Sequence, residues 1–207
     1  MAELIFYTHP MSRGRIVRWM LEEVGQPYRT ELLDFGTSMK AADYLAINPM
    51  GKVPAIRHGD VIVTEGAAIC AYLADTFPQA GLAPAPIDRG AYYRWLFFAA
   101  GPVEQAIVNK SLGVTIPAEQ KKMAGYGDFD DAMAGLEDAV AGKHYVAGDR
   151  FSAADVIVGS QIGWGLMFGS IPDRPAFRDY WAGLADRPAK KRADDIDNAL
   201  MPKADAR

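Results

Sequence analysis

Residues 51–69, GKVPAIRHGDVIVTEGAAI, predict a hairpin that leads directly into a helix. Two short apolar runs, VPAI and VIVT, flank the turn RHGD, in which Gly59 can supply a positive φ. The first run starts with a proline, at a position where a strand loses no needed ladder hydrogen bond. The second run ends in Thr-Glu-Gly, and the apolar segment EGAAICAYLADTFP that follows is typical of a helix. This segment therefore contributes two antiparallel strands and one helix to a small sheet.

Strand and helix patterns alternate before this hairpin. They predict a strand at 3–8, a helix at 12–27, a strand at 28–35 and a short helical or irregular piece at 38–49. His9-Pro10 ends the first strand, and Gly25 followed by Pro27 is the expected stop signal for the first helix. The order β-α-β-α-β-β-α predicts an α/β domain over residues 1–80, in which a right-handed crossover makes the first two strands parallel.

Beyond residue 80 the pattern becomes wholly helical. Residues 78–90 hold three prolines and little that could form a core, so we place a linker at 81–87. Helical periodicity recurs at 88–110, about 117–142, 152–168 and 174–197. The motif FSAADV places Ser152 at an N-cap and Asp155 at N3, a capping box that should begin a buried helix. An all-helical second domain is predicted over residues 88–207.

Composition excludes several classes of function. The 207 residues carry a net charge of -4 and show no basic footprint for nucleic acid. The single cysteine, Cys70, allows no intrachain disulfide and is expected in the core, which suits a reducing compartment such as the cytoplasm. There is no signal-peptide pattern and no run of about 18 apolar residues, so neither secretion nor membrane spanning is expected. The three histidines lack metal-ligand spacing, and no metal is predicted.

Motifs in a fixed order give the chain a family resemblance. They are YTHPMSRGR after the first strand, NPMGKVPAI before the third strand, TEGAAICAYL at the third helix and FSAAD in the helical half. Together, and over nearly the whole length, they resemble the cytosolic glutathione S-transferases. The resemblance implies a thioredoxin-like βαβαββα domain followed by a helical-bundle domain. It also implies a homodimeric detoxification enzyme that conjugates glutathione, its co-substrate, to a small hydrophobic electrophile.

The resemblance assigns glutathione binding to the hairpin and the helix after it. A cis Val53-Pro54 bond is expected, with the N–H and C=O of Val53 pairing with the peptide, whereas the residues alone would leave the bond trans. Glu65-Gly66 starts a helix, whose free N–H groups and macrodipole attract the α-carboxylate of the γ-glutamyl end. Glu65 would then meet the neighbouring ammonium. The family usually has Ser where this chain has Gly66, so a hydroxyl contact is missing.

Alternative readings remain for these residues. Lys52, next to the bend, could reach the peptide, and Lys40 could reach the glycyl carboxylate, but each could be an ordinary solvated lysine. Pro54 could simply be the first residue of a strand. Glu65 could simply be a first-turn carboxylate that complements the helix dipole.

Ser12 is the candidate for activating the thiol. A free thiol with a pKa of about 8.5 is only a few per cent ionised at neutral pH, and lowering that pKa by about two units requires roughly 3 kcal/mol. A hydroxyl hydrogen bond together with a helix N-terminus could supply it. Ser12 lies in the loop where serine-type members hold this hydroxyl, but counting back from Arg15 lands on Met11. Tyr7, Thr8 and backbone N–H groups are alternative donors, and Ser12 could be an ordinary N-cap.

The second substrate is expected between the two domains. Met11, Trp95 and Phe98 are the candidate lining residues, although aromatics at helical spacing are usually core. Isomerisation, peroxide reduction and dehalogenation use the same thiolate and are alternative activities. A non-catalytic glutathione-binding protein of the same fold is a further alternative, favoured by Gly66 and by the register at Ser12. The absence of Cys-x-x-Cys weighs against a disulfide reductase.

Overall fold

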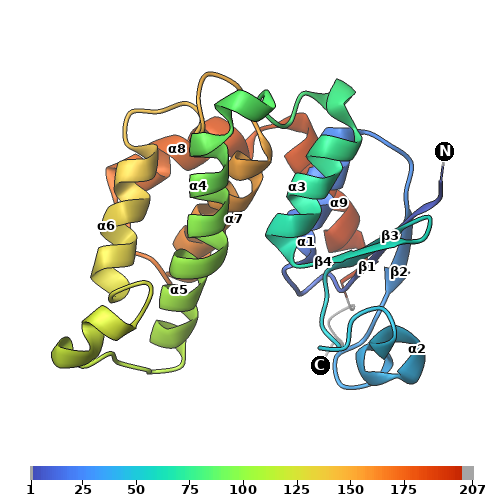
Figure 1. Ribbon diagram of the computed structural model, residues 1–207, viewed down its shortest axis with the longest axis horizontal. Helices are drawn as coiled ribbons and strands as arrows, with labels where there is room; N and C mark the ends of the chain where they lie inside the picture. Colours follow the sequence, from blue (N-terminus) through green and yellow to red (C-terminus); the bar gives the residue numbers. More distant parts are fainter. Residues whose placement is uncertain (1, 202–207) are drawn as a thin grey trace. The chain divides into compact units, whose positions relative to one another are not determined.

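The computed structural model describes residues 2–201, which form two compact units (Figure 1). The first unit contains residues 2–80 together with residues 187–201. The second unit is Gly81–Asp186. Among residues 2–201, no helix is long and apolar enough to cross a membrane.

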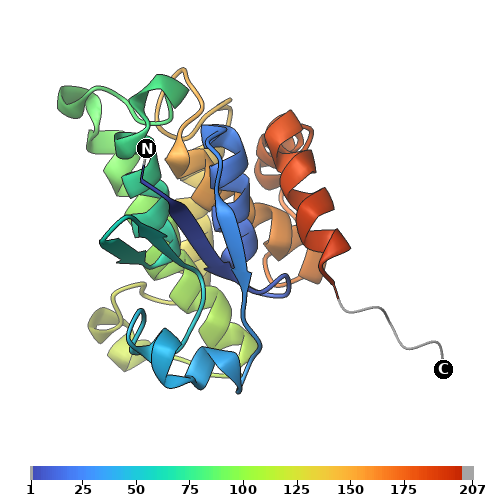
Figure 2. The same cartoon turned by 90° about the vertical axis from the view of Figure 1, so that its right-hand side faces the viewer.

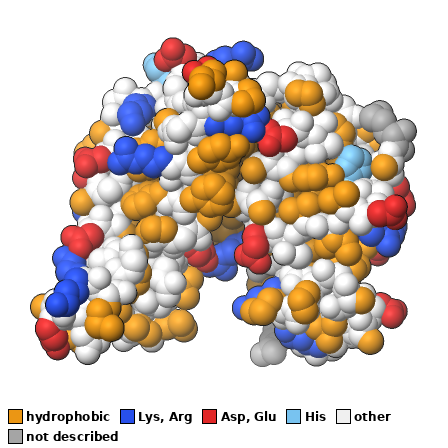
Figure 3. All heavy atoms as spheres, viewed as in Figure 1, with side chains coloured by type: hydrophobic (Ala, Val, Ile, Leu, Met, Phe, Trp, Pro, Cys, Tyr) orange, Lys and Arg blue, Asp and Glu red, His pale blue; other side chains and the backbone are white. Residues whose placement is uncertain are grey.

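A four-stranded mixed sheet in the order β2-β1-β3-β4 forms the centre of the first unit. Its strands are β1 (Leu4–Thr8), β2 (Arg29–Leu32), β3 (Ala55–His58) and β4 (Val61–Thr64). β1 pairs in parallel with β2 and antiparallel with β3, and β3 and β4 form the hairpin. The predicted parallel pairing of the first two strands and the hairpin are thus confirmed. β1 is buried along its whole length, whereas β4 is an edge strand with Val61 and Ile62 exposed, and apolar side chains gather over this edge in Figure 3.

Helices cover the sheet of the first unit. They are α1 (Gly14–Val24), α2 (Ala42–Leu45), α3 (Gly66–Thr76) and α9 (Pro188–Ala199), with 3₁₀ turns at Ser38–Lys40 and Pro78–Ala80. α1 buries the apolar face that its spacing predicts and packs against α3, and Figure 2 shows α1 behind the sheet. It ends at Gly25, whose φ of 70° is left-handed and whose N–H donates to the Leu21 carbonyl at 3.0 Å.

Helix α9 corrects the predicted domain division. The prediction placed residues 88–207 in the helical domain, but α9 packs along α1 of the first unit. The physical reason is a buried ion pair, since Arg18 of α1 donates to Asp197 of α9 at 3.1 Å. Helical periodicity shows that a helix has a buried face but does not show which surface covers that face.

Every named element of the second unit is helical. The elements are α4 (Gly90–Phe98), a π-turn (Ala99–Val103), α5 (Glu104–Ser111), α6 (Phe129–Val140), α7 (Ala153–Phe168), α8 (Pro175–Ala185) and 3₁₀ turns at Pro86–Asp88 and Ala118–Met123. The predicted helix at 88–110 is thus interrupted by the π-turn, which contains Pro102. The predicted segment at 174–197 is two helices, because Pro188 begins α9.

Helix α7 is the buried centre of the second unit, and its start matches the prediction. The Asp155 carboxylate accepts the N–H of Ser152 at 2.8 Å and the Ser152 hydroxyl at 3.1 Å. It also accepts the N–H of Val146 and the hydroxyl of Tyr180, both at 2.7 Å. The capping carboxylate therefore joins the start of α7 to the preceding loop and to α8. The predicted linker at 81–87 also belongs to this unit, where Leu82 accepts the N–H of Ala153.

Candidate functional site

Three chain segments meet at one end of the strands in the first unit, where β1 ends and β3 begins. β1 and β3 are antiparallel, with Tyr7 opposite Ala55, so the loop after β1 lies beside the start of β3. β3 and β4 are antiparallel, with Ala55 opposite Thr64, so the start of α3 lies beside the same point. The register therefore brings together the loop after β1, the Val53-Pro54 bend and the N-terminus of α3.

The bend before β3 presents unpaired main chain. The Val53-Pro54 bond is cis, in agreement with the expectation. The carbonyl of Lys52 accepts the Tyr44 hydroxyl at 2.6 Å and the Asn48 side-chain amide at 2.8 Å. Because the Lys52-Val53 peptide is planar and trans, these bonds direct the N–H of Val53 away from both side chains. The N–H and C=O of Val53 have no hydrogen-bond partner among the described residues, so they offer a donor and an acceptor to an extended peptide.

Asn48 organises the loop that leads to this bend. Its Oδ1 accepts the N–H of Met50 at 3.1 Å, while its amide holds the Lys52 carbonyl. Gly51 has a φ of 57°, and a Cβ there would lie 2.6 Å from a main-chain oxygen, so the turn requires glycine. Lys40 is exposed and donates to the Met50 carbonyl at 2.9 Å, which places it against the same loop. Lys52 has an exposed side chain.

Sequence reasoning missed the roles of Tyr44 and Asn48. Asn48-Pro49 is recognisable as a turn, but the hydrogen bonds to the Lys52 carbonyl depend on the path of the loop. Burial is the main cause that raises the pKa of Tyr44 to about 12, so its hydroxyl keeps its proton at neutral pH and remains a donor.

The start of α3 leaves hydrogen-bond donors available. The first helical bond runs from the N–H of Ile69 to the carbonyl of Glu65 at 2.9 Å. The N–H groups of residues 66–68 therefore have no intrahelical partner. Glu65 has φ 67° and ψ 119°, a conformation that L-residues rarely adopt and that costs about 1–3 kcal/mol. The Glu65 side chain is exposed and does not cap the helix. A free carboxylate therefore lies beside the positive end of the helix dipole.

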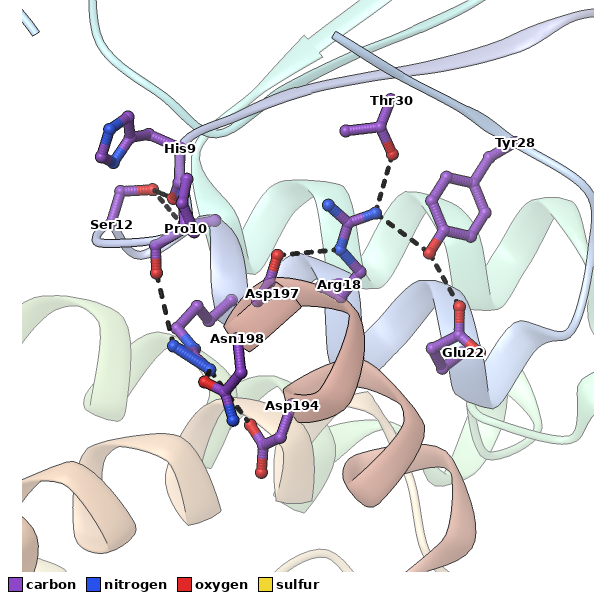
Figure 4. Close-up of polar contacts among 12 residues, drawn as sticks. His9, Pro10, Ser12, Arg18, Glu22, Tyr28, Thr30, Asp194, Asp197 and Asn198 are labelled. Carbon is purple, nitrogen blue, oxygen red and sulfur yellow. Dashed lines mark hydrogen bonds and ion pairs between the residues drawn. The ribbon is translucent and has the colours of Figure 1, made fainter. Parts of the chain in front are cut away.

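The hydroxyl of Ser12 is held within its own loop (Figure 4). It donates to the carbonyl of His9 at 2.7 Å and accepts the N–H of Gly14 at 2.9 Å. Ser12 thus satisfies one of the free donors at the start of α1, as a capping residue does. Its proton points to the His9 carbonyl, so the hydroxyl must rotate before it can donate to a ligand.

The two alternative hydroxyls are part of the protein interior. Tyr7 belongs to the core and packs against the ring of Tyr44, with the ring centres 5.6 Å apart. Thr8 is fully buried, and its Oγ1 has no hydrogen-bond partner. A Cβ on Gly14 would lie 1.9 Å from that oxygen, so α1 begins directly against the Thr8 side chain. Of Tyr7, Thr8 and Ser12, only Ser12 is partly exposed to solvent.

An apolar patch lies beside Ser12. Met11, predicted to contact the second substrate, has 62% of its surface exposed. Phe35, which sequence reasoning missed, is 57% exposed, and its ring centre lies 4.5 Å from that of His9. The available signal was an aromatic residue at the end of the predicted strand at 28–35, three residues beyond the end of β2 in the structure. Together Met11 and Phe35 offer apolar surface next to the candidate catalytic loop.

Trp95 and Phe98 lie in the second unit. Trp95 is only 7% exposed, and its ring contacts the edge of Phe98 at 5.7 Å between centres. The guanidinium of Arg94 lies 4.2 Å from the Trp95 ring centre, and the ammonium of Lys143 lies 5.5 Å from it. Trp95 also lines a cavity of about 700 Å³ formed by α4 and the 142–149 segment. In these contacts Trp95 is largely a core residue.

Other candidate chemistry is limited in the described part of the chain. Within residues 2–201, no group of three or more His, Cys, Asp or Glu side chains could hold a metal ion. Cys70 is fully buried in α3, and burial raises the pKa of its thiol far above the usual value. Cys70 therefore stays a thiol and packs as an apolar side chain.

In this thioredoxin-like domain, a bent main chain with an unpaired donor and acceptor lies beside the open N-terminus of a helix. The family model described as "Glutathione S-transferase, N-terminal domain" matches residues 11–76. Glutathione S-transferase GstB of Escherichia coli is 30% identical over 184 residues, which cover 83% of this chain and 88% of that protein. Glutathione S-transferase 3 of Zea mays is 28% identical over 210 residues, with 91% and 92% covered. The chain belongs to the glutathione S-transferase family.

Solved structures agree with this assignment. A glutathione transferase of Methylococcus capsulatus superposes with a TM-score of 0.78 at 28% identity, covering 95% of this chain and 99% of that one. A sphingomonad glutathione S-transferase complexed with glutathione gives a TM-score of 0.75 at 29% identity, with 94% and 98% covered. The family and the thioredoxin-like fold expected from the motifs are thus confirmed.

Proposed function

We propose that the protein is a glutathione transferase that binds reduced glutathione in its first unit and joins it to a small hydrophobic electrophile. The observation that carries the proposal is the convergence of the free main chain of Val53 with the open N-terminus of α3. The N–H and C=O of Val53 pair with the cysteinyl residue of glutathione. The α-carboxylate of the γ-glutamyl residue binds the N–H groups at Gly66, and Glu65 pairs with the adjacent ammonium. Pro54 shapes the bend.

The two lysines extend this site toward the rest of the peptide. Lys40 is anchored on the Met50 carbonyl, and from there its ammonium meets the glycyl carboxylate. Lys52 supplies a second positive charge beside the bend. Structures of similar glutathione transferases with bound glutathione support glutathione as the co-substrate.

Ser12 activates the thiol in this proposal. Rotation turns its proton from the His9 carbonyl to the sulfur, while its lone pair still accepts the N–H of Gly14 at the start of α1. The thiol proton passes to solvent, and the thiolate receives a hydrogen bond near a positive helix end. The sulfur then forms a bond to the electrophilic carbon. Either a leaving group departs with its electron pair, or an activated alkene takes up a proton after the addition.

The electrophile is proposed to bind against Met11 and Phe35, because both are exposed, apolar and close to Ser12. Trp95 and Phe98 remain a prediction for the same substrate. The exposed apolar side chains of edge strand β4 support a homodimer. The proposed setting is the cytoplasm, where reduced glutathione is available.

A non-catalytic glutathione-binding protein is the second candidate, because the Ser12 proton is directed to a carbonyl and Gly66 lacks a hydroxyl. Calorimetry with reduced glutathione, followed by the ultraviolet absorbance of the thiolate in the complex across pH, separates the two. The transferase predicts that the thiol pKa falls by about two units from its free value of about 8.5. Binding with an unshifted thiol supports the binding protein. No binding overturns both.

A further inference from the structure

Helices α1 and α9 carry charges in an order that each helix alone disfavours. Along α1 cations precede acids: Arg15, Arg18, Glu22, Glu23. From the residue before α9 onward the same order recurs: Arg187, Arg192, Asp194, Asp197. A helix dipole favours acids at the N-terminus and cations at the C-terminus, and neither helix has an acid in its first turn or a base in its last. The pattern becomes favourable only when the two helices pack antiparallel.

The contacts confirm this antiparallel pairing at the end far from the candidate catalytic loop. Arg187 donates to both carboxylate oxygens of Glu23, at 2.6 and 2.8 Å. Arg192 donates to the Glu22 carboxylate at 3.1 Å and to the Glu22 carbonyl at 3.2 Å. The end of α1 is thus joined to the beginning of α9.

A buried ion pair fixes the middle of the two helices. Arg18 and Asp197 have side chains that are each 1% exposed and are joined at 3.1 Å. The Arg18 guanidinium also donates to Thr30 at 2.8 Å and to Tyr28 at 3.2 Å, and it lies 4.9 Å from the ring centre of Phe6. A charge so enclosed tolerates little displacement, so the register of α9 on α1 is set here.

The last contact between the helices reaches the candidate catalytic loop (Figure 4). Arg15, at the start of α1, is 21% exposed, and its Nη2 donates to the Asn198 side-chain oxygen of α9 at 2.5 Å. The same nitrogen lies 3.9 Å from the Asp194 carboxylate. Its other terminal nitrogen, Nη1, donates to the carbonyl of Pro10 at 3.4 Å. One guanidinium therefore connects the end of α9 to the loop between β1 and α1.

The Pro10 carbonyl belongs to the Pro10-Met11 peptide, one peptide before the Met11-Ser12 peptide. The N–H on the other side of this planar peptide, that of Met11, donates to Nδ1 of His9 at 3.1 Å. Arg15 and His9 thus hold the Pro10-Met11 peptide from opposite sides. This peptide is the central one of the turn that the Ser12 N–H closes on the His9 carbonyl at 3.1 Å, the same carbonyl that accepts the Ser12 hydroxyl. If the Arg15 bond is lost, the central peptide loses one of its two restraints, and the turn that holds the Ser12 hydroxyl loosens.

We propose that Arg15 is a positioning residue, and that α9 holds the catalytic loop in its active geometry through Asn198. The inference rests on the proposed function for its catalytic consequence, but the mechanical coupling does not require glutathione. It gives the C-terminal helix a role in thiol activation although none of its residues touches the thiol.

The test compares three single variants of the full chain by amide hydrogen exchange of residues 9–15 without ligand. Asn198→Ala removes the acceptor from an exposed position, and exchange in the loop is expected to quicken by about tenfold, the effect of losing one charge-assisted bond. Asn198→Asp keeps an oxygen acceptor and is expected to retain wild-type exchange. Arg192→Gln, the matched control, breaks a contact on the same face of α9 far from the loop and leaves exchange unchanged.

The second readout is the thiol pKa of bound glutathione in the same variants. In Asn198→Ala it is expected to rise toward the free value, while calorimetric affinity at about pH 6, where little thiolate forms, stays within about twofold of wild type because the peptide contacts at Val53 and Gly66 are intact. Unchanged loop exchange in Asn198→Ala overturns the coupling, as does an equal effect from Arg192→Gln. If wild type binds no glutathione, the proposed function fails, and the exchange arm still decides the coupling.

Discussion

Gly66→Ser should restore the hydroxyl contact that the family usually makes and so tighten glutathione binding. Gly66 is the first residue of α3, and a Cβ placed on it meets no atom within 4 Å. Its φ lies outside the left-handed region, so a side chain fits without backbone strain. The added hydroxyl can donate to the carboxylate that the open helix N-terminus is proposed to bind.

The size of the gain follows from two opposing terms. A hydrogen bond to a charged group contributes about 1.5–3 kcal/mol, whereas fixing an interfacial side chain costs roughly 0.5–1.5 kcal/mol. The net gain of about 1 kcal/mol corresponds to a dissociation constant roughly fivefold lower. The largest net gain that these terms allow is about 2.5 kcal/mol, so an effect beyond roughly seventyfold would require more than one new contact.

Gly66→Ala is the matched control, because it adds the Cβ without the hydroxyl. Both variants should raise the free energy of unfolding by about 0.5–1 kcal/mol, since each removes glycine from a helix. Only Gly66→Ser should lower the dissociation constant measured by calorimetry. Equal affinity of the two variants would show that the carboxylate does not lie at Gly66, and the reasoning about the helix N-terminus would be refuted.

Three further substitutions test separate parts of the account. Ser12→Ala should return the bound thiol pKa toward about 8.5 and lower kcat by about 10²-fold or more, while glutathione affinity stays within about twofold at about pH 6, where little thiolate forms; unchanged turnover of a test electrophile would assign activation to backbone donors. Tyr44→Phe should weaken glutathione binding a few-fold, because only Asn48 then orients the Lys52 carbonyl. The raised Tyr44 pKa means that the unfolded chain loses this proton first, so wild-type stability falls as pH rises from about 10 toward about 12. Chemical denaturation of Tyr44→Phe should show a smaller fall in the free energy of unfolding between about pH 10 and about pH 12. A pH profile identical to that of wild type would contradict the burial of the Tyr44 hydroxyl. Ser152→Ala should lower the free energy of unfolding by about 1 kcal/mol without changing glutathione affinity, and a neutral effect would remove the capping role.

Local signals in the sequence predict much of the first unit and the start of α7 in the second. The hairpin turn, the end of α1 at Gly25 and the capping box at Ser152 are each set by residues close together in the chain. The register of a hairpin follows from its turn, and this register brings Val53 next to the start of α3. The resemblance to the glutathione S-transferases assigned the main-chain part of the candidate site, whereas the residues alone would leave the Val53-Pro54 bond trans.

Features that depend on distant chain segments could not be predicted in this way. The position of α9 depends on Arg18 and Asp197 meeting in the interior, and the two residues are 179 positions apart. Residues 190–197 hold three cations followed by three acids. Because these charges balance one another within one helix, the sequence predicts a solvated helix face there. The orientation of the Ser12 hydroxyl depends on where the His9 carbonyl points, which a residue list cannot show.

Reduced glutathione is proposed to bind in the first unit at the end of the strands where β1 ends and β3 begins. A crystal structure of the protein grown with reduced glutathione tests this claim most directly. We expect the cysteinyl main chain to pair with Val53, and the γ-glutamyl carboxylate to lie on the N–H groups at the start of α3. Glutathione bound elsewhere, or a Val53 main chain left unpaired in the complex, would contradict it.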